Sequence, residues 1–302
     1  EYYCGIPVFG AVPRSTEMNL SMRHLGLVPF REGMENPEFA KTIHGVIRHV
    51  SENVDIDAIK SIAEDVTPEP NSVTGSLSSN PKPEKKIGIA FDEAFTFYYG
   101  ELEAVLRSRG YEIIRFSPVH DALPDADGYI FGGGYPELFA NELAENASMR
   151  EAILNKAISG TPIYAECGGL MYLTRSLTIK KGWRECPKDT TYPMCGVFAG
   201  DTIMPVKKTL RYVEGTANLG GISYPFKGHE FHYSGISMDT DTKFAYSLSR
   251  GTGIINGKDG VVFNNAVGSY THLMPVASGD ILAEIFCPGS EKDYLNADSG
   301  RT

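Results

Sequence analysis

The 302-residue sequence lacks two features that mark large classes of proteins, a long apolar run and a cluster of basic residues. No apolar stretch reaches the roughly 18–20 residues that a membrane-spanning helix needs, so we expect no membrane partner. The chain has 28 Lys and Arg against 38 Asp and Glu, which gives a formal net charge of −10, and the basic residues form no cluster. Nucleic acid is therefore not expected as a partner, because its phosphates are bound through gathered positive charge.

Paired cysteines are also missing. The five cysteines are odd in number, widely scattered and free of CxxC spacing: Cys4, Cys167, Cys186, Cys195 and Cys287. This distribution argues against a disulfide framework and against a zinc site. We therefore expect no metal site, and we expect the protein to work in the reducing cytoplasm.

A phosphate-binding P-loop is the third absence. No GxxxxGK[ST] sequence occurs, and the nearest approach, Gly257-Lys258, is followed by Asp259 where Ser or Thr is needed. The chain also opens at Glu1, without an initiator methionine, in the strand-like pattern IPVFGAVPR. We expect it to be a fragment whose upstream part is missing.

The composition divides the chain into four parts. Residues 1–66 show a strand-like pattern at Pro7–Val12 and helical spacing within 36–50 and 55–65. Residues 67–86 are rich in Pro, Ser and Asn and predict a linker, because they hold too few apolar groups to order themselves. Residues 87–288 form the main domain, and a polar tail follows over 289–302.

The main domain opens with an alternation of strands and helices, which predicts a doubly wound, mainly parallel α/β sheet. Past about residue 190 short strands separated by Gly-rich turns predict antiparallel additions. The expected strands of the first part are Ile87–Phe91, Tyr111–Phe116 and Gly128–Phe131, with helices at Phe97–Arg109 and Ser148–Ile158. The expected later strands include Gly196–Phe198, Thr209–Val213, His229–Tyr233, Gly253–Ile255, Val261–Phe263 and Ala266–Tyr270.

One cysteine lies where a sharp strand-to-helix turn is expected. The β-rich run Thr161–Ala165 leads to Cys167, after which come two glycines and an apolar, helix-like run. Such a turn exposes a nucleophile, and the N–H groups at the start of the following helix favour thiolate over thiol. The arrangement resembles a nucleophile elbow with Cys in place of Ser.

A cysteine nucleophile needs a general base and an oxyanion hole. His272 ends a predicted strand of the same sheet, and ligands of such sheets bind at the carboxyl ends of strands, so we favour it as the base. The rival histidines, His229 and His232, are three apart on a strand-like segment and should therefore point to opposite faces. The triple glycine of GGGYPE (132–137) also follows a strand end, and its N–H groups with that of Gly168 are candidates for the oxyanion hole.

Other polar residues in these motifs are pocket candidates. The run DEAFTFYY (92–99) places two carboxylates at the carboxyl end of a strand, followed by aromatic residues. The pocket candidates are Asp92, Glu93, Tyr135, Glu137, His229 and His232.

Taken together, DEAFTFYY, FGGGYPEL, YAECGGLMYL, GHEFHYS and SYTHL, in this order, resemble the cobyrinic acid a,c-diamide synthase family. The glutaminase half of that family is a class I glutamine amidotransferase of the cobalamin-synthesis type. The resemblance covers residues 87–275. In addition, RHLGLVPF (23–30) resembles the end of the family's P-loop-type α/β amidoligase domain. The resemblance thus implies that residues 1–66 are the tail of that domain and that most of it is missing.

The resemblance also implies roles and partners. Cys167 would be the nucleophile and His272 its activating base, while Gly133, Gly134 and Gly168 would form the oxyanion hole and bind glutamine. The complete enzyme would use L-glutamine, ATP and Mg²⁺ to amidate the a and c carboxylates of cobyrinic acid, whereas glutamine hydrolysis itself would need no cofactor. Its partners would be the tetrapyrrole carboxylate, the missing amidoligase domain and a second copy in a homodimer.

Three alternatives stay open at this point. The tetrapyrrole could be nickel sirohydrochlorin, on the route to coenzyme F430. The domain could instead be a cysteine hydrolase of another kind, or a non-catalytic, amidotransferase-like binding domain.

The wider amidotransferase class often has a glutamate two residues after the catalytic histidine, where this chain has Met274. The third member of a triad is therefore either Asp92 or Glu93, or it is absent and Cys167 and His272 act as a dyad.

Overall fold

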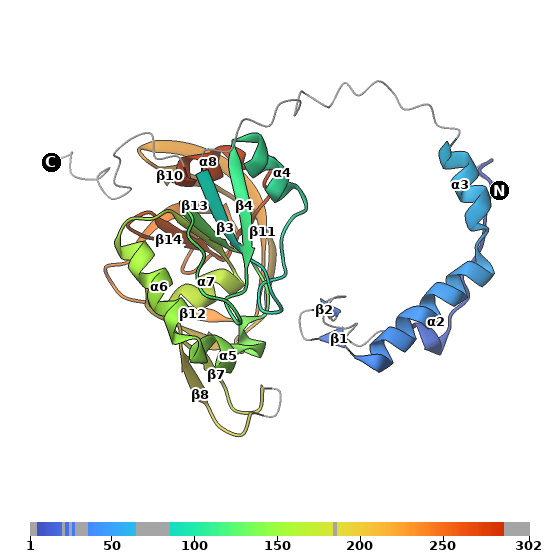
Figure 1. Cartoon of the computed structure of the whole chain (residues 1–302), viewed down its shortest axis with the longest axis horizontal. Helices are drawn as coiled ribbons and strands as arrows, with labels where there is room; N and C mark the ends of the chain where they lie inside the picture. Colours follow the sequence, from blue (N-terminus) through green and yellow to red (C-terminus); the bar gives the residue numbers. More distant parts are fainter. Residues whose placement is uncertain are drawn as a thin grey trace. The chain divides into compact units, whose positions relative to one another are not determined.

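The computed structural model describes residues 5–19, 22–23, 26–27, 36–64, 85–183 and 186–286. The contacts divide the chain into two units, Glu1–Leu77 and Ser78–Thr302, which are described separately (Figure 1). Residues 67–84 of the predicted linker and the whole predicted tail, 289–302, lie outside the described residues, as does most of the RHLGLVPF segment.

The first unit is mainly two helices, α2 (Pro37–Asn53) and α3 (Ile56–Glu64), with the short elements η1 (Thr16–Met18), β1 (Met22–Arg23) and β2 (Gly26–Leu27) before them. Helix α2 begins where the side chain of Asn36 accepts the N–H groups of Glu38 and Phe39. The strand expected at Pro7–Val12 is wrong. Only Gly10 makes an isolated bridge, to Val54, because no further strand lies beside this largely exposed segment within the described residues.

The second unit is built on a ten-stranded sheet whose core is parallel, as the sequence predicted. Strands β15 (Ala266–Ser269), β6 (Ile163–Glu166), β5 (Gly128–Phe131), β3 (Lys85–Ala90) and β4 (Tyr111–Phe116) lie side by side in this order. All four pairings among them are parallel. This places the carboxyl ends of the strands before Cys167 and before the triple glycine at one edge.

Helices cover both faces of this parallel core (Figure 1). On one face α4 (Glu101–Ser108) and α8 (Gly279–Phe286) pack against Ile87, Ile89 and Ile130. On the other, α6 (Ala147–Ile158) and α7 (Gly168–Leu173) pack against Ala165 and Phe131. The short α5 (Ala140–Glu145) and η2 (Pro136–Leu138) precede α6. Because side chains alternate along a strand, β3, β5 and β6 contribute to both clusters, which is the doubly wound arrangement.

The other five strands are antiparallel and curl the sheet round on itself. They run in the order β16 (His272–Leu273), β11 (Ile222–His232), β10 (Thr209–Leu219), β13 (Lys243–Arg250) and β14 (Lys258–Phe263), and β14 then pairs with β15. Strands β15 and β16 are thus five positions apart in the sheet, about 24 Å if it were flat. Yet only Tyr270 and Thr271 join them, and this connection spans at most about 11 Å. The sheet must therefore bend until β16 returns to the edge where β6 ends.

A second sheet has four strands, in the order β12 (Gly235–Met238), β9 (Phe198–Met204), β7 (Thr174–Ile179) and β8 (Thr190–Pro193). Of the strand expected at Gly196–Phe198 only Phe198, the first residue of β9, is in a strand. Two further local expectations are wrong. The helix expected from Phe97 begins only at Glu101, because Phe97 bridges to Gly133 instead. The segment Gly253–Ile255 is a turn, in which only Ile255 makes a bridge, to Lys258. Across the described residues, no helix combines the length and apolar character that crossing a membrane requires.

Candidate active site

Cys167 occupies the sharp turn that the sequence predicted, between β6 and α7. Its backbone has φ 44° and ψ −96°, a region that non-glycine residues rarely adopt and that marks strain at functional sites. The turn is held by the Cys167 N–H, which donates to the Ser269 carbonyl at 2.8 Å, and by the Gly169 N–H, which donates to the Gly132 carbonyl at 2.9 Å. A Cβ on Gly169 would lie 2.1 Å from the Phe131 carbonyl oxygen, so only glycine fits there.

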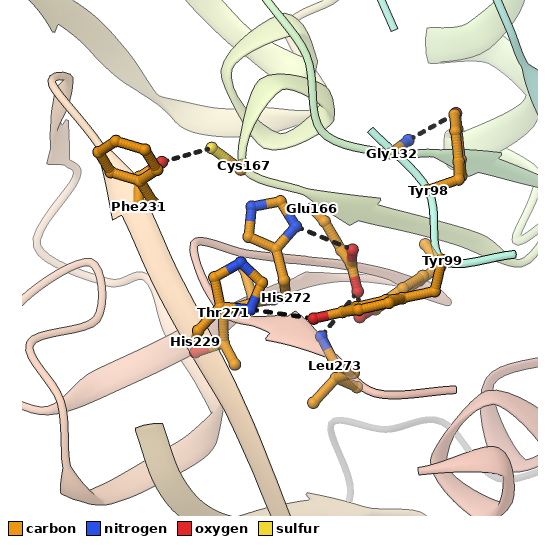
Figure 2. Close-up of polar contacts among 12 residues, drawn as sticks. Tyr98, Tyr99, Gly132, Glu166, Cys167, His229, Phe231, Thr271, His272 and Leu273 are labelled. Atoms are coloured by element: carbon orange, nitrogen blue, oxygen red, sulfur yellow. Dashed lines mark hydrogen bonds and ion pairs between the residues drawn. The ribbon is translucent and has the colours of Figure 1, made fainter. Parts of the chain in front are cut away.

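His272 is the first residue of β16 and lies beside Cys167. The curl of the sheet brings it there, and its side chain is buried, with 3% of the residue exposed. Its Nδ1 lies 3.2 Å from Oε2 of Glu166 (Figure 2). Its ring is also close enough to Cys167 for that side chain to raise its pKa, while the Cys167 Sγ donates to the Phe231 carbonyl oxygen at 3.7 Å. Since Nδ1 faces Glu166, Nε2 is the nitrogen left for Cys167.

Glu166 is the residue that the sequence analysis missed. Its other oxygen, Oε1, accepts the Leu273 N–H at 3.0 Å (Figure 2). The same oxygen accepts the Tyr164 hydroxyl at 2.6 Å. The carboxylate is thus fixed from two sides and directed at the imidazole. Cys167, His272 and Glu166 thus lie in series, with the imidazole beside the thiol and oriented by the carboxylate, which is the arrangement of a catalytic triad.

Neither carboxylate that the sequence offered for this role contacts His272. Asp92 is buried and accepts the N–H groups of Ala94 and Phe95 at 2.9 and 3.1 Å, so it stabilises the loop after β3. Burial raises its pKa. Glu93 pairs with His120 at 2.6 Å near the surface. The expectation of Asp92, Glu93 or no carboxylate at all is therefore corrected to Glu166.

The electrostatics of the site favour a charged imidazole. Burial alone lowers the pKa of His272, but the hydrogen bonds to Cys167 and Glu166 outweigh it and raise the pKa from 6.5 to about 10. His272 is therefore an imidazolium at neutral pH. A positive charge beside a thiol favours the thiolate, which is the nucleophilic form of cysteine.

This raised pKa predicts a pH-dependent stability. Between pH 6.5 and about 10 the folded protein keeps a proton on His272 that the unfolded chain releases, so its free energy of unfolding falls as the pH rises. A His272→Gln variant lacks this contribution to the pH dependence of the free energy of unfolding. We expect the melting temperature of the wild type, relative to that variant, to fall by roughly a few degrees over this range. Thermal melts at matched ionic strength measure it, and parallel curves for the two proteins would contradict the charged imidazole.

The three consecutive glycines are not equivalent. The Gly132 N–H donates to the Tyr98 hydroxyl at 2.9 Å, and the Gly133 N–H donates to the Phe97 carbonyl at 3.2 Å. Gly133 is therefore already engaged, contrary to the expectation that it serves the oxyanion hole. In the part of the chain that the structure describes, the N–H groups of Gly134 and Gly168 have no acceptor. These two lie together, since a Cβ on Gly168 would be 2.9 Å from the Gly134 nitrogen.

Aromatic rings form the rim of the site around His272. The His229 ring stacks on the His272 ring with centroids 4.8 Å apart and 15° between the planes. Its Nδ1 lies 3.1 Å from the Tyr99 hydroxyl (Figure 2). The Phe97 ring meets the His272 ring edge-on, with centroids 5.1 Å apart. Burial, and then the neighbouring His272, lower the pKa of His229. A neutral ring is thus stacked against the imidazolium.

His232 lies elsewhere, as strand alternation predicted. It is buried, its Nδ1 is 2.8 Å from the Ser234 carbonyl oxygen, and it stacks on Tyr270 at 3.7 Å. Of the remaining pocket candidates, half-buried Tyr135 and buried Glu137 belong to the turn after the triple glycine, beside the elbow. Among the described residues no group of three or more His, Cys, Asp and Glu side chains is placed to hold a metal ion.

Comparison with known proteins identifies the family of the chain. Residues 86–278 match the model of the CobB/CobQ-like glutamine amidotransferase domain. The chain belongs to this family. Proteins named cobyrinate a,c-diamide synthase are 46% identical to it in Methanosarcina barkeri and 41% identical in Methanosarcina acetivorans, over 92% and 94% of the chain.

The chain spans about three fifths of the length of these two relatives, 60% and 61%. Among solved structures, that of PurLQS from Thermotoga maritima is 14% identical, with a TM-score of 0.43 over 68% of this chain and 93% of that one.

Proposed function

We propose that this amidotransferase chain carries the glutaminase half of a cobyrinate a,c-diamide synthase. The observation that carries the proposal is the series Cys167, His272 and Glu166 at the elbow of a CobB/CobQ-like domain. The relatives named cobyrinate a,c-diamide synthase support the identity of the final acceptor.

The geometry supports the following course of glutamine hydrolysis. The Cys167 thiolate attacks the carboxamide carbon of glutamine, and the N–H groups of Gly134 and Gly168 stabilise the oxyanion. The C–N bond breaks as His272 gives its Nε2 proton to the departing nitrogen, which leaves ammonia and a γ-glutamyl thioester. Water then attacks the thioester while the neutral His272 takes a proton from it, and glutamate and the thiolate are released.

Glu166 contributes to both half-reactions through His272. His272 alternates between imidazolium and imidazole, and the carboxylate at Nδ1 stabilises the charged form and holds the ring in place. The stacked His229 restricts the ring further. No step here requires a cofactor.

The amidation itself would take place on another part of the complete enzyme. ATP and Mg²⁺ would activate the ring carboxylates there as acyl phosphates, which the ammonia attacks. This chain has no P-loop motif for such a site, so no step of this activation is assigned to its residues. The first unit would be the tail of the amidoligase domain. A homodimer and a cytoplasmic location belong to the same proposal.

Glutamate release tests the proposal first. We expect the chain to release glutamate from glutamine but not from asparagine, and to form a covalent adduct at Cys167 with a glutamine-analogue electrophile. A cysteine hydrolase of another kind would cleave other amides or peptides, and a non-catalytic domain would give neither glutamate nor an adduct. Either result would overturn the glutaminase.

The acceptor needs a second experiment. The full-length enzyme is given glutamine, ATP and Mg²⁺ with either cobyrinic acid or nickel sirohydrochlorin, and the products are weighed by mass spectrometry. Two amidations of cobyrinic acid support the proposal. Amidation of nickel sirohydrochlorin alone would assign the chain to the alternative, nickel-sirohydrochlorin a,c-diamide synthase.

A further inference from the structure

Tyr270 and Thr271 carry the chain from β15 to β16 and so determine where His272 stands. Just before them, the Ser269 carbonyl accepts the N–H of Cys167 at 2.8 Å. This two-residue crossing is therefore attached to the nucleophile at one end and to its partner imidazole at the other. Any group that fixes the crossing also fixes the separation of Cys167 and His272.

Asp259, on the neighbouring strand β14, is such a group. Its Oδ1 accepts the Tyr270 N–H at 3.0 Å, and its Oδ2 accepts the Thr271 N–H at 2.9 Å and the Thr271 hydroxyl at 2.7 Å. We infer that Asp259 is a positioning residue, which holds His272 in line with Cys167 through these hydrogen bonds. The inference rests on the glutaminase chemistry proposed above.

The chemistry of the contact explains why a carboxylate stands here. Asp259 is fully buried, with 0% exposed, and no Lys, Arg or His of the described residues pairs with it. Burying a charge in this way is unfavourable unless hydrogen bonds compensate. Burial raises the pKa of Asp259, and the bonds from Thr271 and Tyr270 limit the rise to about 6, so the group is a carboxylate at neutral pH. Only a carboxylate accepts on both oxygens, whereas Asn would turn its NH₂ toward one of the donors.

The rest of the crossing is equally constrained, which gives Asp259 a rigid segment to act on. The Ser269 hydroxyl donates to the Thr271 carbonyl at 2.8 Å. The Tyr270 ring stacks on His232, and its hydroxyl lies 2.8 Å from that of Ser234. Loss of the Asp259 acceptors would release the two N–H groups in this segment, and the segment would rearrange to satisfy them elsewhere.

Two variants test the inference. Asp259→Asn disturbs the acceptor of both N–H groups, whereas Thr271→Val removes only the hydrogen bond of the hydroxyl. Displacement of a catalytic group by about 1 Å is enough to lower a rate about a hundredfold. We expect Asp259→Asn to lower kcat for glutamine hydrolysis by about 10- to 100-fold and to change KM by less than about threefold. Here kcat is calculated per active site, and the active sites are titrated with a glutamine-analogue electrophile. Thr271→Val keeps both N–H bonds and should lower kcat only a few-fold.

A second readout needs no glutamine. Alkylation of Cys167 by iodoacetamide at pH 7, followed by mass spectrometry, reports whether His272 still favours the thiolate. We expect Asp259→Asn to slow it about tenfold per folded molecule. Leu177→Ala, a buried change on β7 of the other sheet, serves as a control that lowers the melting temperature without touching the crossing.

The outcomes separate the two proposals. Slower alkylation in Asp259→Asn but not in Leu177→Ala supports the positioning role, even if no glutaminase activity is found. If Asp259→Asn has the wild-type alkylation rate and the wild-type kcat per titrated site, the positioning role is overturned. The proposed glutaminase function is not affected by that result. If Asp259→Asn does not fold, Thr271→Val decides, since wild-type values of both quantities in that variant would overturn the inference.

Discussion

Replacing Cys167 by alanine is expected to abolish glutamine hydrolysis, with kcat lowered at least about a thousandfold. In the proposed mechanism the thioester forms on this sulfur alone, and no described group could take its place. His272 and Glu166 position and protonate but do not attack. Glutamate release in a coupled assay measures the loss. The adduct with a glutamine-analogue electrophile should disappear with it.

Cys195→Ala is the matched control for this prediction. Cys195 is buried to a similar degree, with 3% exposed against 6% for Cys167, but it has no contact with His272 or Glu166 among the described residues. Burial raises its pKa, so it stays a protonated, unreactive thiol. The control should keep the wild-type kcat. Hydrolysis that survives in Cys167→Ala, or is lost in Cys195→Ala, would contradict the assignment of the nucleophile.

The elbow could be predicted because its signal is local. A β-rich run, a cysteine, two glycines and an apolar helix specify strand, turn and helix by residue type alone, and the structure has β6, Cys167 and α7 in this order. The parallel core could be predicted in the same way. Its elements β3, α4 and β4 each follow from the periodicity of apolar residues within their own segment. The placement of His272 needed only the rule that active residues gather at the carboxyl ends of strands.

The curl of the sheet could not be predicted, because it depends on pairings between strands far apart in sequence. Nothing in the two residues of β16 shows that they pair with β11, where His272 lies opposite His229. His229 was predicted as a pocket residue, and the argument against it as the base treated His229 and His232 as one unit. Only the strand pairing shows that one histidine of the two, His229, lies against the His272 ring and stacks on it.

Glu166 was missed for a related reason. Neighbouring residues on a strand point to opposite faces, so a carboxylate directly before the nucleophile is a poor candidate for its triad. The elbow removes this objection, because the positive φ at Cys167 turns the sulfur away from the strand's alternation while Glu166 still follows it. The signal was present in the acidic residue of YAECGG, but its meaning depends on a backbone angle.

Glu166→Gln is expected to lower kcat about 100- to 1,000-fold, the second-largest loss among these variants. The amide has the same shape, and its oxygen can still accept the Leu273 N–H and the Tyr164 hydroxyl. Its NH₂ group, however, would face Nδ1 of His272, where the imidazolium also carries a proton. The ring would lose the charged form that protonates the departing ammonia. The pKa of His272 would also fall, because Glu166 is one of the groups that raise it.

The pH profile of kcat separates this role from a structural one. The alkaline limb, where His272 loses its proton, should move to lower pH in Glu166→Gln and stay in place in Tyr164→Phe. The tyrosine variant removes a hydrogen bond to Glu166 but leaves the carboxylate on the imidazole, so we expect kcat to fall less than about tenfold. A Glu166→Gln enzyme with wild-type kcat and an unmoved alkaline limb would show that Cys167 and His272 act as a dyad. The hydrogen bond between Glu166 and Nδ1 would then serve the fold of the strand end and not the reaction.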